Sequence, residues 1–319
     1  MIDKLDSKVI SLLRFPLIVG VVCIHSRMGG GGVVEALLGN AYGIVAVPIF
    51  LAISGYLFFP SKEVRFGKEL YITKLKRRAK SLLIPYLLWN LIAYICYAIG
   101  EGFNTLDFIK SFWVIDIPGR SGSSPIDGPL WYVRNLMLIM IASPIIYYFI
   151  KHKIIVLLLI MAWVTGISPF DKGIFIAITF FTLGGYLRYN SYSVSQLHGY
   201  WYYAVFCVAA IMLLFIPSTF VFYLQKIIII SGMLTLVSIA KKLPNTDNKI
   251  YNELASATFF IYCCHDIILT YIKPIVSYYS TLWIAYLLLV TGDIICCLVL
   301  YVMITKLSPK FSKFLTGGR

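Results

Sequence analysis

Charged side chains are scarce in this chain. Only 13% of its 319 residues are Asp, Glu, Lys or Arg, whereas about a quarter is usual in soluble domains. Acidic residues are the rarest, 14 against 28 basic ones. So little charge cannot cover a globule of this size in water, but it suits a surface that faces lipid. The composition therefore excludes an ordinary soluble fold.

Several enzyme motifs are also missing. The sequence has no G-x-S-x-G elbow and no H-E-x-x-H pattern, which removes the usual basis for a serine hydrolase or a zinc protease. The glycine stretch 29–32 lacks phosphate-loop spacing and is interpreted as a turn. The seven cysteines fall inside apolar runs without metal-ligand or disulfide spacing, so we expect them to pack as small hydrophobes. No metal is expected.

Long apolar runs are what the chain does contain. A bilayer core about 30 Å thick needs about 20 apolar residues in a helix, and about ten such runs are present. The sequence therefore predicts an all-α, polytopic transmembrane bundle. The expected spans are Val9–Met28, Ala41–Phe59, Leu82–Ile99, Pro129–Ile150, Ile154–Ile167, Ile174–Tyr189, Tyr200–Ile216, Ile227–Ala240, Leu254–Ile272 and Leu282–Ile304. The fifth and eighth are short, so nine or eleven spans also fit.

The basic residues predict the orientation. With the N-terminus inside, 20 of the 28 Lys and Arg fall in inside segments and six in outside segments, while Arg14 and Arg134 lie within spans. Because cytoplasmic loops carry the excess of Lys and Arg, both termini are expected to be cytoplasmic. The same distribution explains the net charge of +14 without a nucleic-acid partner, and none is expected.

The chain is expected to form one membrane-embedded unit, 1–319, with two notable loops. The first, Ser61–Ser81, is basic and cytoplasmic. It either lies on anionic lipid or captures a polyanionic ligand such as the phosphates of coenzyme A, through Lys74, Lys76, Arg77, Arg78 and Lys80. The second, Gly100–Gly128, is extracytoplasmic and either covers a cavity or merely connects two helices.

Ionisable side chains inside spans are costly and therefore mark candidate sites. They are Arg14, His25, Arg134, His265, Asp266 and Asp293. Arg14 and His25 are eleven residues apart, which on a helix is about three turns and roughly 16 Å, so they share one face of the first span. Either both side chains face the bundle interior, or Arg14 extends to the cytoplasmic phosphates while His25 lies at the outer interface.

The other four have open interpretations. His265 is either a hydrogen-bonded packing residue or an acid/base group, and its neighbour Asp266 points about 100° away from it. Asp293 either pairs with a buried arginine or takes part in chemistry. Arg134 follows Trp131 near an interface, where an aromatic belt explains it equally well.

Five segments resemble the acyltransferase-3 family of bacterial membrane acyltransferases. The first is the Arg14 and His25 spacing after a Leu-Arg-Phe stretch. Four more are similar in the expected order and on the expected spans: Pro48–Tyr56 to F-F-x-x-S-G-Y, Lys76–Tyr86 to R-x-x-R-L-L-P-Y, Gly128–Asn135 to G-P-L-W-F-L and Ala257–His265 to F-x-I-Y-x-x-H. Two departures are a single Phe50 where two aromatics are usual and Lys80 where Arg is common.

The resemblance implies a bacterial inner-membrane enzyme that moves an acyl group, most often acetyl, from acyl-CoA to a glycan or glycolipid hydroxyl. We expect His25 to be the general base, Arg14 the donor ligand and structural clamp, and His265 a second acid/base group or an orienter. Ser54, Tyr56, Trp131, Arg134 and Asp293 are candidates for substrate contact or oxyanion stabilisation. The alternative is a transporter or flippase of a lipid-linked sugar, and no oligomeric state is predicted.

Overall fold

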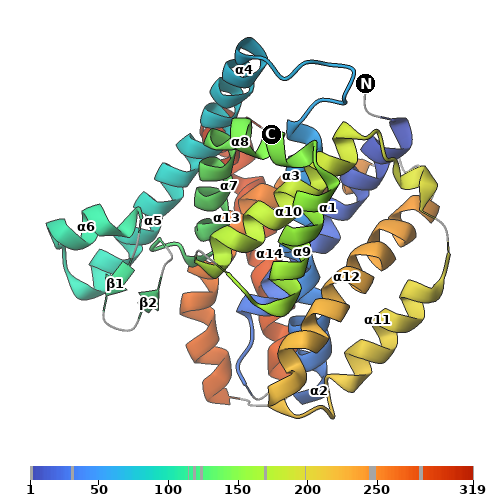
Figure 1. Ribbon diagram of the computed structural model, residues 1–319. Coiled ribbons are helices and arrows are strands. Elements are labelled where there is room, and N and C mark those ends of the chain that lie inside the picture. Colours follow the sequence, from blue (N-terminus) through green and yellow to red (C-terminus); the bar gives the residue numbers. More distant parts are fainter. Residues whose placement is uncertain are drawn as a thin grey trace.

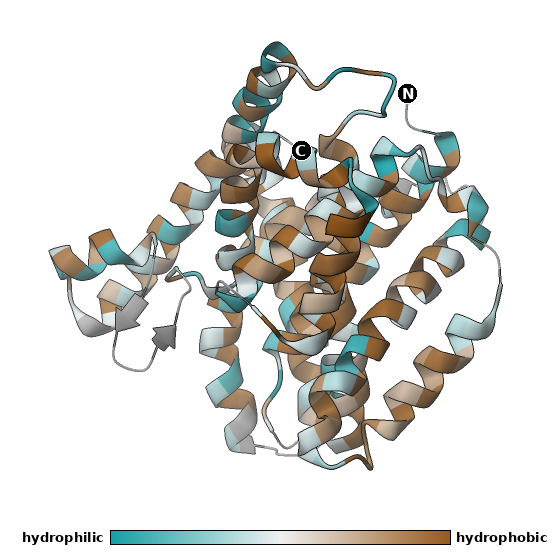
Figure 2. Ribbon diagram, in the orientation of Figure 1, coloured by the Kyte–Doolittle hydropathy of each residue, from teal (hydrophilic) through white to brown (hydrophobic). Residues whose placement is uncertain are grey.

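The computed structural model describes residues 3–29, 32–113, 115–117, 120–122, 125–168, 171–197, 199–243, 249–279 and 283–318. These residues form a helical bundle with one small hairpin at its side (Figure 1). The expected all-helical membrane fold is therefore confirmed in its coarse form. Large apolar side chains cover much of the outer surface of the helices, as Figure 2 shows along their shafts.

The helices follow one another with short connections. They are α1 (Lys4–His25), α2 (Gly32–Glu35), α3 (Ala46–Phe58), α4 (Lys68–Arg78), α5 (Ile84–Glu101), α6 (Thr105–Ser111), α7 (Trp131–Ile141), α8 (Ser143–Ile150), α9 (Lys153–Thr165), α10 (Lys172–Tyr189), α11 (Trp201–Met212), α12 (Ser218–Lys242), α13 (Lys249–Tyr279), α14 (Trp283–Leu307) and α15 (Pro309–Thr316). Shorter or wider helical turns are η1 (Ala36–Tyr42), η2 (Gly43–Val45), η3 (Ala79–Leu83), η4 (Gly128–Leu130) and η5 (Val194–Gln196). Strands β1 (Ile115–Ile117) and β2 (Arg120–Gly122) pair antiparallel.

Six helical segments of the described chain are long and apolar enough to span a membrane. They are Lys4–His25, Gly32–Phe58, Lys68–Gly100, Ser218–Lys242, Tyr251–Val276 and Trp283–Leu307. A seventh arises if Gly128–Ile141 and Ser143–Ile150, bent by 76°, count as one. The remaining expected spans correspond to α9, α10 and α11, of which α9 and α11 are only 13 and 12 residues long. The count of ten therefore stays a prediction.

Local sequence explains the bend in the expected span Pro129–Ile150. Pro144 lies in the first turn of α8 and has no N–H to bond the carbonyl four residues earlier. The helix consequently ends at Ile141 and restarts at Ser143, so this span is broken rather than straight. Similarly, the basic segment expected as a loop at 61–81 is helical from Lys68 onward, and the outer loop at 100–128 contains α6 and the hairpin.

The helix α1 lies at the centre of the bundle, where it contacts α3, α12, α13 and α14. Next to it, α3 and α10 have the most extensive contact of any pair of described helices. Glycines make this possible: a Cβ on Gly184 would lie 1.9 Å from the carbonyl O of Ala52, and one on Gly55 would lie 2.0 Å from that of Phe181. Small residues at such crossings are typical of membrane bundles.

Both chain ends lie at the same end of the bundle, the end from which α4 projects (Figure 1). The C-terminal helix α15 packs on the start of α5, where Trp89 Nε1 donates to the carbonyl O of Leu315 at 3.1 Å. We call this the termini end and the opposite one the far end. Hydrophilic residues gather at the termini end, on α4 and the first turns of α1 (Figure 2).

Candidate active site

One helix positions both residues of the arginine–histidine pair. The helix α1 continues through Pro16, although a proline there leaves the carbonyl of Leu12 without its helical donor. The hydroxyl of Tyr251 on α13 donates to that carbonyl instead. This contact ties α1 to α13 at the level of Arg14, so the two helices that carry the candidate site are joined directly.

A cavity of about 370 Å³ lies against this part of α1. Arg14 forms part of its wall together with side chains from α3, α4, α7 and α13. The polar or charged members are Arg14, Ser54, Arg78, Tyr132, Ser256, Thr258 and Tyr262. Two guanidinium groups in one wall, with hydroxyls around them, fit an anionic and hydrogen-bonding ligand.

The hydroxyls are arranged by contacts between helices. Ser54 Oγ on α3 lies 3.3 Å from the hydroxyl of Tyr132 on α7. The ring of Tyr132 packs edge-on against that of Tyr262 on α13, with centroids 5.8 Å apart. The hydroxyl of Tyr262 donates to the carbonyl of Pro129. These contacts hold three helices around the cavity at fixed positions.

The basic segment of α4 divides into two kinds of residue. Arg78 lines the cavity, whereas Lys76, Arg77 and Lys80 are exposed. Lys74 donates to the carbonyl of Phe58 at the C-terminus of α3, where a cation meets unpaired carbonyls and the negative end of the helix dipole. In the structure Lys74 therefore anchors α4 to α3, and Arg78 is the member of this segment that reaches the cavity.

At the end of α1, His25 meets two side chains of α13. Its Nδ1 lies 3.5 Å from Asp266 Oδ1, and its ring packs edge-on against that of His265 with centroids 5.0 Å apart. Both His25 and Asp266 keep partial exposure, 29% and 25% of their side chains. A carboxylate beside one ring nitrogen leaves the other free to accept a proton, as in the known base–orienter pairs.

His265 is fully buried and its tautomer follows from its contacts. Its Nδ1 lies 2.8 Å from the carbonyl O of Tyr262 and 3.1 Å from that of Ile261. Carbonyl oxygens only accept, so Nδ1 carries the hydrogen and Nε2 is an acceptor. Within the described residues Nε2 has no hydrogen-bond partner. It is therefore an unused hydrogen-bond acceptor next to the ring of His25.

The cavity and this histidine cluster are neighbours but are not continuous. Val21 and Tyr262 belong to the cavity wall, and His25 follows Val21 by four residues, about one helical turn. The ring of Tyr262 lies 6.3 Å from that of His265. The end of the cavity wall at Val21 thus lies about one helical turn from His25.

The other candidates from the sequence lie away from the cavity wall. The hydroxyl of Tyr56 donates to Asp6 Oδ2 at 2.6 Å, in a separate cavity. Arg134 is buried and donates to the carbonyl of Trp113, which fixes the segment after α6 to α7. Asp293 is buried on α14, where Oδ1 accepts from Cys297 Sγ at 3.7 Å. Trp131 packs next to Tyr132 at the start of α7.

Sequence reasoning did not assign three residues that the structure brings to the site. Asp266 was recognised as an ionisable residue within a span, but it pairs with a residue 241 positions away in the sequence, so the pairing leaves no local signal. Tyr132 lines the cavity one position after Trp131, the residue that was singled out. Lys273, counted with an outer loop, extends its Nζ to 3.4 Å from the carbonyl O of His25.

A charged cavity and an imidazole–carboxylate pair inside a helical membrane bundle are the features of a membrane-embedded enzyme. Comparison with known sequences agrees. The profile of the acyltransferase domain family Acyl_transf_3 matches residues 8–302, so this multi-pass membrane protein belongs to the acyltransferase 3 family and the resemblance seen in the sequence is confirmed. The chain is also similar to the succinoglycan biosynthesis protein ExoH of Rhizobium meliloti (strain 1021), with 26% identity over 97% of this chain and 92% of that protein. No solved structure matches the chain with statistical significance.

Proposed function

We propose that the protein transfers an acyl group, acetyl in the first instance, from acyl-CoA to a hydroxyl of a cell-surface glycan or its lipid-linked precursor. The observation that carries this proposal is the adjacency of the Arg14 and Arg78 cavity to the His25–Asp266 pair. Membership of an acyltransferase family supports the reaction class. The similarity to a succinoglycan biosynthesis protein supports a polysaccharide acceptor.

The donor occupies the cavity from the termini end. Arg78 and Arg14 bind phosphate or amide oxygens of coenzyme A, and the exposed Lys76, Arg77 and Lys80 attract its negative charge. Placing this end in the cytoplasm, where acyl-CoA is made, agrees with the excess of basic residues there. The whole chain then acts as one unit in the bacterial cytoplasmic membrane.

His25 is the general base of the transfer. Its Nε2 accepts the proton of the acceptor hydroxyl while that oxygen attacks the thioester carbonyl carbon. The carbon–sulfur bond then breaks, the acyl ester is formed, and the coenzyme A sulfur leaves and takes the proton from His25. Asp266 fixes the imidazole orientation through Nδ1, and the Nε2 of His265 accepts a hydrogen bond from a second hydroxyl of the acceptor.

The developing oxyanion requires a donor close to His25. We assign this role to Lys273, because its Nζ lies 3.4 Å from the carbonyl O of His25. Ser54 lines the donor cavity and is assigned to binding the arm of the donor instead. Tyr56, Arg134 and Asp293 have hydrogen bonds within the fold, so we assign them structural roles.

The test is acyl transfer by the purified protein in lipid nanodiscs with acetyl-CoA or succinyl-CoA, followed by mass spectrometry of the glycan. His25→Ala and Arg14→Ala should each abolish transfer while the protein remains in the membrane. His152→Ala, an exposed histidine between α8 and α9, is the matched control and should keep normal activity. Normal transfer by either site variant contradicts its role, and the absence of any acyl-CoA consumption favours the transporter alternative.

A further inference from the structure

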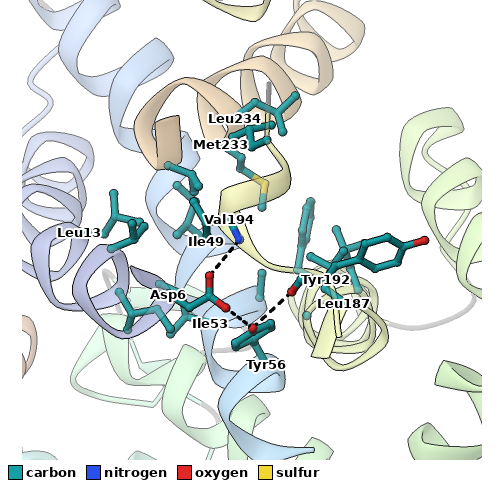
Figure 3. A pocket seen from close by; sticks show the side chains of 18 of the residues that line it. Asp6, Leu13, Ile49, Ile53, Tyr56, Leu187, Tyr192, Val194, Met233 and Leu234 are labelled. Carbon is teal, nitrogen blue, oxygen red and sulfur yellow. Dashed lines mark hydrogen bonds between the residues drawn. The ribbon is translucent and has the colours of Figure 1, made fainter. Parts of the chain in front are cut away.

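A second cavity of about 470 Å³ lies beside the donor cavity, and α1 and α3 contribute to the walls of both. Its walls come from α1, α3, α9, α10 and α12, and η5 closes one end. Figure 3 shows Leu13, Ile49, Leu187, Met233 and Leu234 around it. The candidate active site does not use this cavity.

The side chains that line this second cavity favour a hydrocarbon ligand. Nearly all side chains that line the cavity are aliphatic or aromatic, and all of its helices lie within the bundle. An apolar cavity of about 150 Å³ holds one benzene and stays dry. The present cavity has about three times that volume, which corresponds to about 18 carbons on the same scale. This is the size of one long acyl chain and far too small for a polyprenyl chain.

The cavity has one polar end, which the N-terminal part of α1 builds. Asp6 Oδ2 accepts from the hydroxyl of Tyr56 at 2.6 Å, and Oδ1 accepts from the backbone N of Val194 at 2.9 Å (Figure 3). Oδ1 also accepts from Ser193 Oγ at 2.8 Å. The carboxylate is thus buried and satisfied within the fold. It holds η5 in place over the cavity and does not need a ligand of its own.

Two cations lie beside this polar end. The guanidinium of Arg188 lies 5.6 Å from the ring centroid of Tyr56, and Lys241 Nζ donates to the carbonyls of Ser195 and Leu197, both at 3.0 Å. Tyr56 and Leu197 are themselves wall residues. Positive charge next to the mouth of an apolar cavity, at the end of a membrane bundle, complements a lipid phosphate.

We propose that this cavity binds an acyl chain of an anionic glycerophospholipid, whose phosphate meets Arg188 and Lys241. The site is independent of the transfer reaction, because none of its residues lies in the donor cavity except Ile53, which borders both. Bound lipid fills the space between α12 and the α3–α10 pair and holds these helices together.

Trp163 provides the readout, since it lines the cavity and is only 3% exposed on the protein surface. The probe is phosphatidylglycerol with brominated acyl chains, added as a minor component to phosphatidylcholine nanodiscs. The quenching that disappears in Trp163→Phe reports a chain inside the cavity. We expect it with brominated phosphatidylglycerol and at least tenfold less with brominated phosphatidylcholine at the same mole fraction.

Two pairs of variants make the test specific. Val237→Phe fills the cavity, whereas Val299→Phe places the same ring on α14 at a position that is 52% exposed, so only the first should lose the Trp163 signal. Lys241→Gln should weaken the preference for phosphatidylglycerol about tenfold, whereas Lys242→Gln, whose ammonium lies over Tyr200, should keep it.

Several results would overturn the proposal. They are equal quenching of Trp163 by the two lipids, an unchanged signal in Val237→Phe, and competition by polyprenyl phosphate but not by unlabelled phosphatidylglycerol. The wild-type measurement does not depend on any cavity-filling variant, so misfolding of Val237→Phe does not remove the test.

Discussion

The relative placement of His25 and Arg14 can be predicted from helix geometry alone. Their spacing of eleven predicts a common face, and the structure places both on α1, with Arg14 in the cavity wall and His25 one turn beyond its end. The partner of His25 could not be found in this way. Asp266 reaches it because α13 crosses α1, and such a crossing depends on the packing of the whole bundle.

The contact between His25 and Asp266 predicts a specific kinetic defect. Asp266→Asn keeps the shape of the side chain but removes the charge that orients the imidazole and stabilises it when protonated. We expect kcat for acyl transfer to fall by about 10²–10⁴-fold, as for the loss of a general acid–base contribution, with KM for acyl-CoA nearly unchanged.

Steady-state kinetics on the purified variant provide the measurement. Asp107→Asn, on α6 at a distance from the site in sequence and fold, is the control and should behave as wild type. A variant at position 266 with an unchanged kcat would show that the imidazole does not depend on this carboxylate.

At the scale of single elements, α4 is a case in which helix propensity and charge pattern favour different structures. The sequence predicted a basic loop at 61–81, yet Lys68–Arg78 contains mainly good helix formers and no glycine or proline. Its charge indicated either a segment that lies on anionic lipid or one that captures a polyanionic ligand. Because the segment is helical, consecutive side chains point about 100° apart. Arg78 therefore lines the cavity, whereas Arg77 is exposed.

A comparison of the two neighbouring arginines tests whether only the one that lines the cavity binds the acyl donor. Arg78→Gln removes a charged hydrogen-bonding group from the cavity proposed for acyl-CoA. A hydrogen bond to a charged group is worth about 1.5–3 kcal/mol. KM for acyl-CoA should therefore rise by about 10-fold to 100-fold. Arg77→Gln carries the same change on the exposed side of α4 and should raise KM by no more than about 3-fold. Equal effects in the two variants would contradict a specific role for Arg78.

The crossing of α3 and α10 makes a prediction about stability. Gly184→Ala places a Cβ 1.9 Å from the carbonyl O of Ala52, so the two helices must separate. Overpacking of this kind costs about 1–3 kcal/mol or more, and thermal unfolding in detergent should shift to lower temperature. Gly292→Ala, where a Cβ meets nothing within 4 Å, should leave the unfolding temperature unchanged or raise it. The same temperature for both variants would refute the close-packed crossing.

For the whole molecule, the sequence predicted the class of fold because hydrocarbon runs of span length have few other uses. The number of spans was harder to predict. The bend after Ile141 and the short helices α9 and α11 are set by local breaks and by neighbouring helices, which average hydropathy does not register. Broken helices inside a bundle are tolerated where surrounding protein satisfies their backbone groups.

The topology predicts which side of the membrane each surface faces. Lys110 on α6, in the expected outer loop, and Lys310 on the C-terminal helix α15 are both exposed, and each is replaced by cysteine in turn. With both termini cytoplasmic, an impermeant maleimide should label the first in intact cells, relative to the parent chain, and the second only after lysis. Labelling of position 310 in intact cells would reverse the assigned orientation.

The single turn of helix between Val21 and His25 has an energetic consequence for the proposed reaction. The highly charged nucleotide portion of the donor stays with Arg14 and Arg78, on the side where it arrived, and only the uncharged arm of the donor with its acyl group extends past Tyr262. Moving a neutral group over about 6 Å does no work against the membrane voltage, in contrast with the roughly 2.3 kcal/mol per charge per 100 mV that an ion would require. Such an enzyme needs neither a proton gradient nor nucleotide hydrolysis to carry an acyl group from one compartment to the other, because the thioester already supplies the driving force.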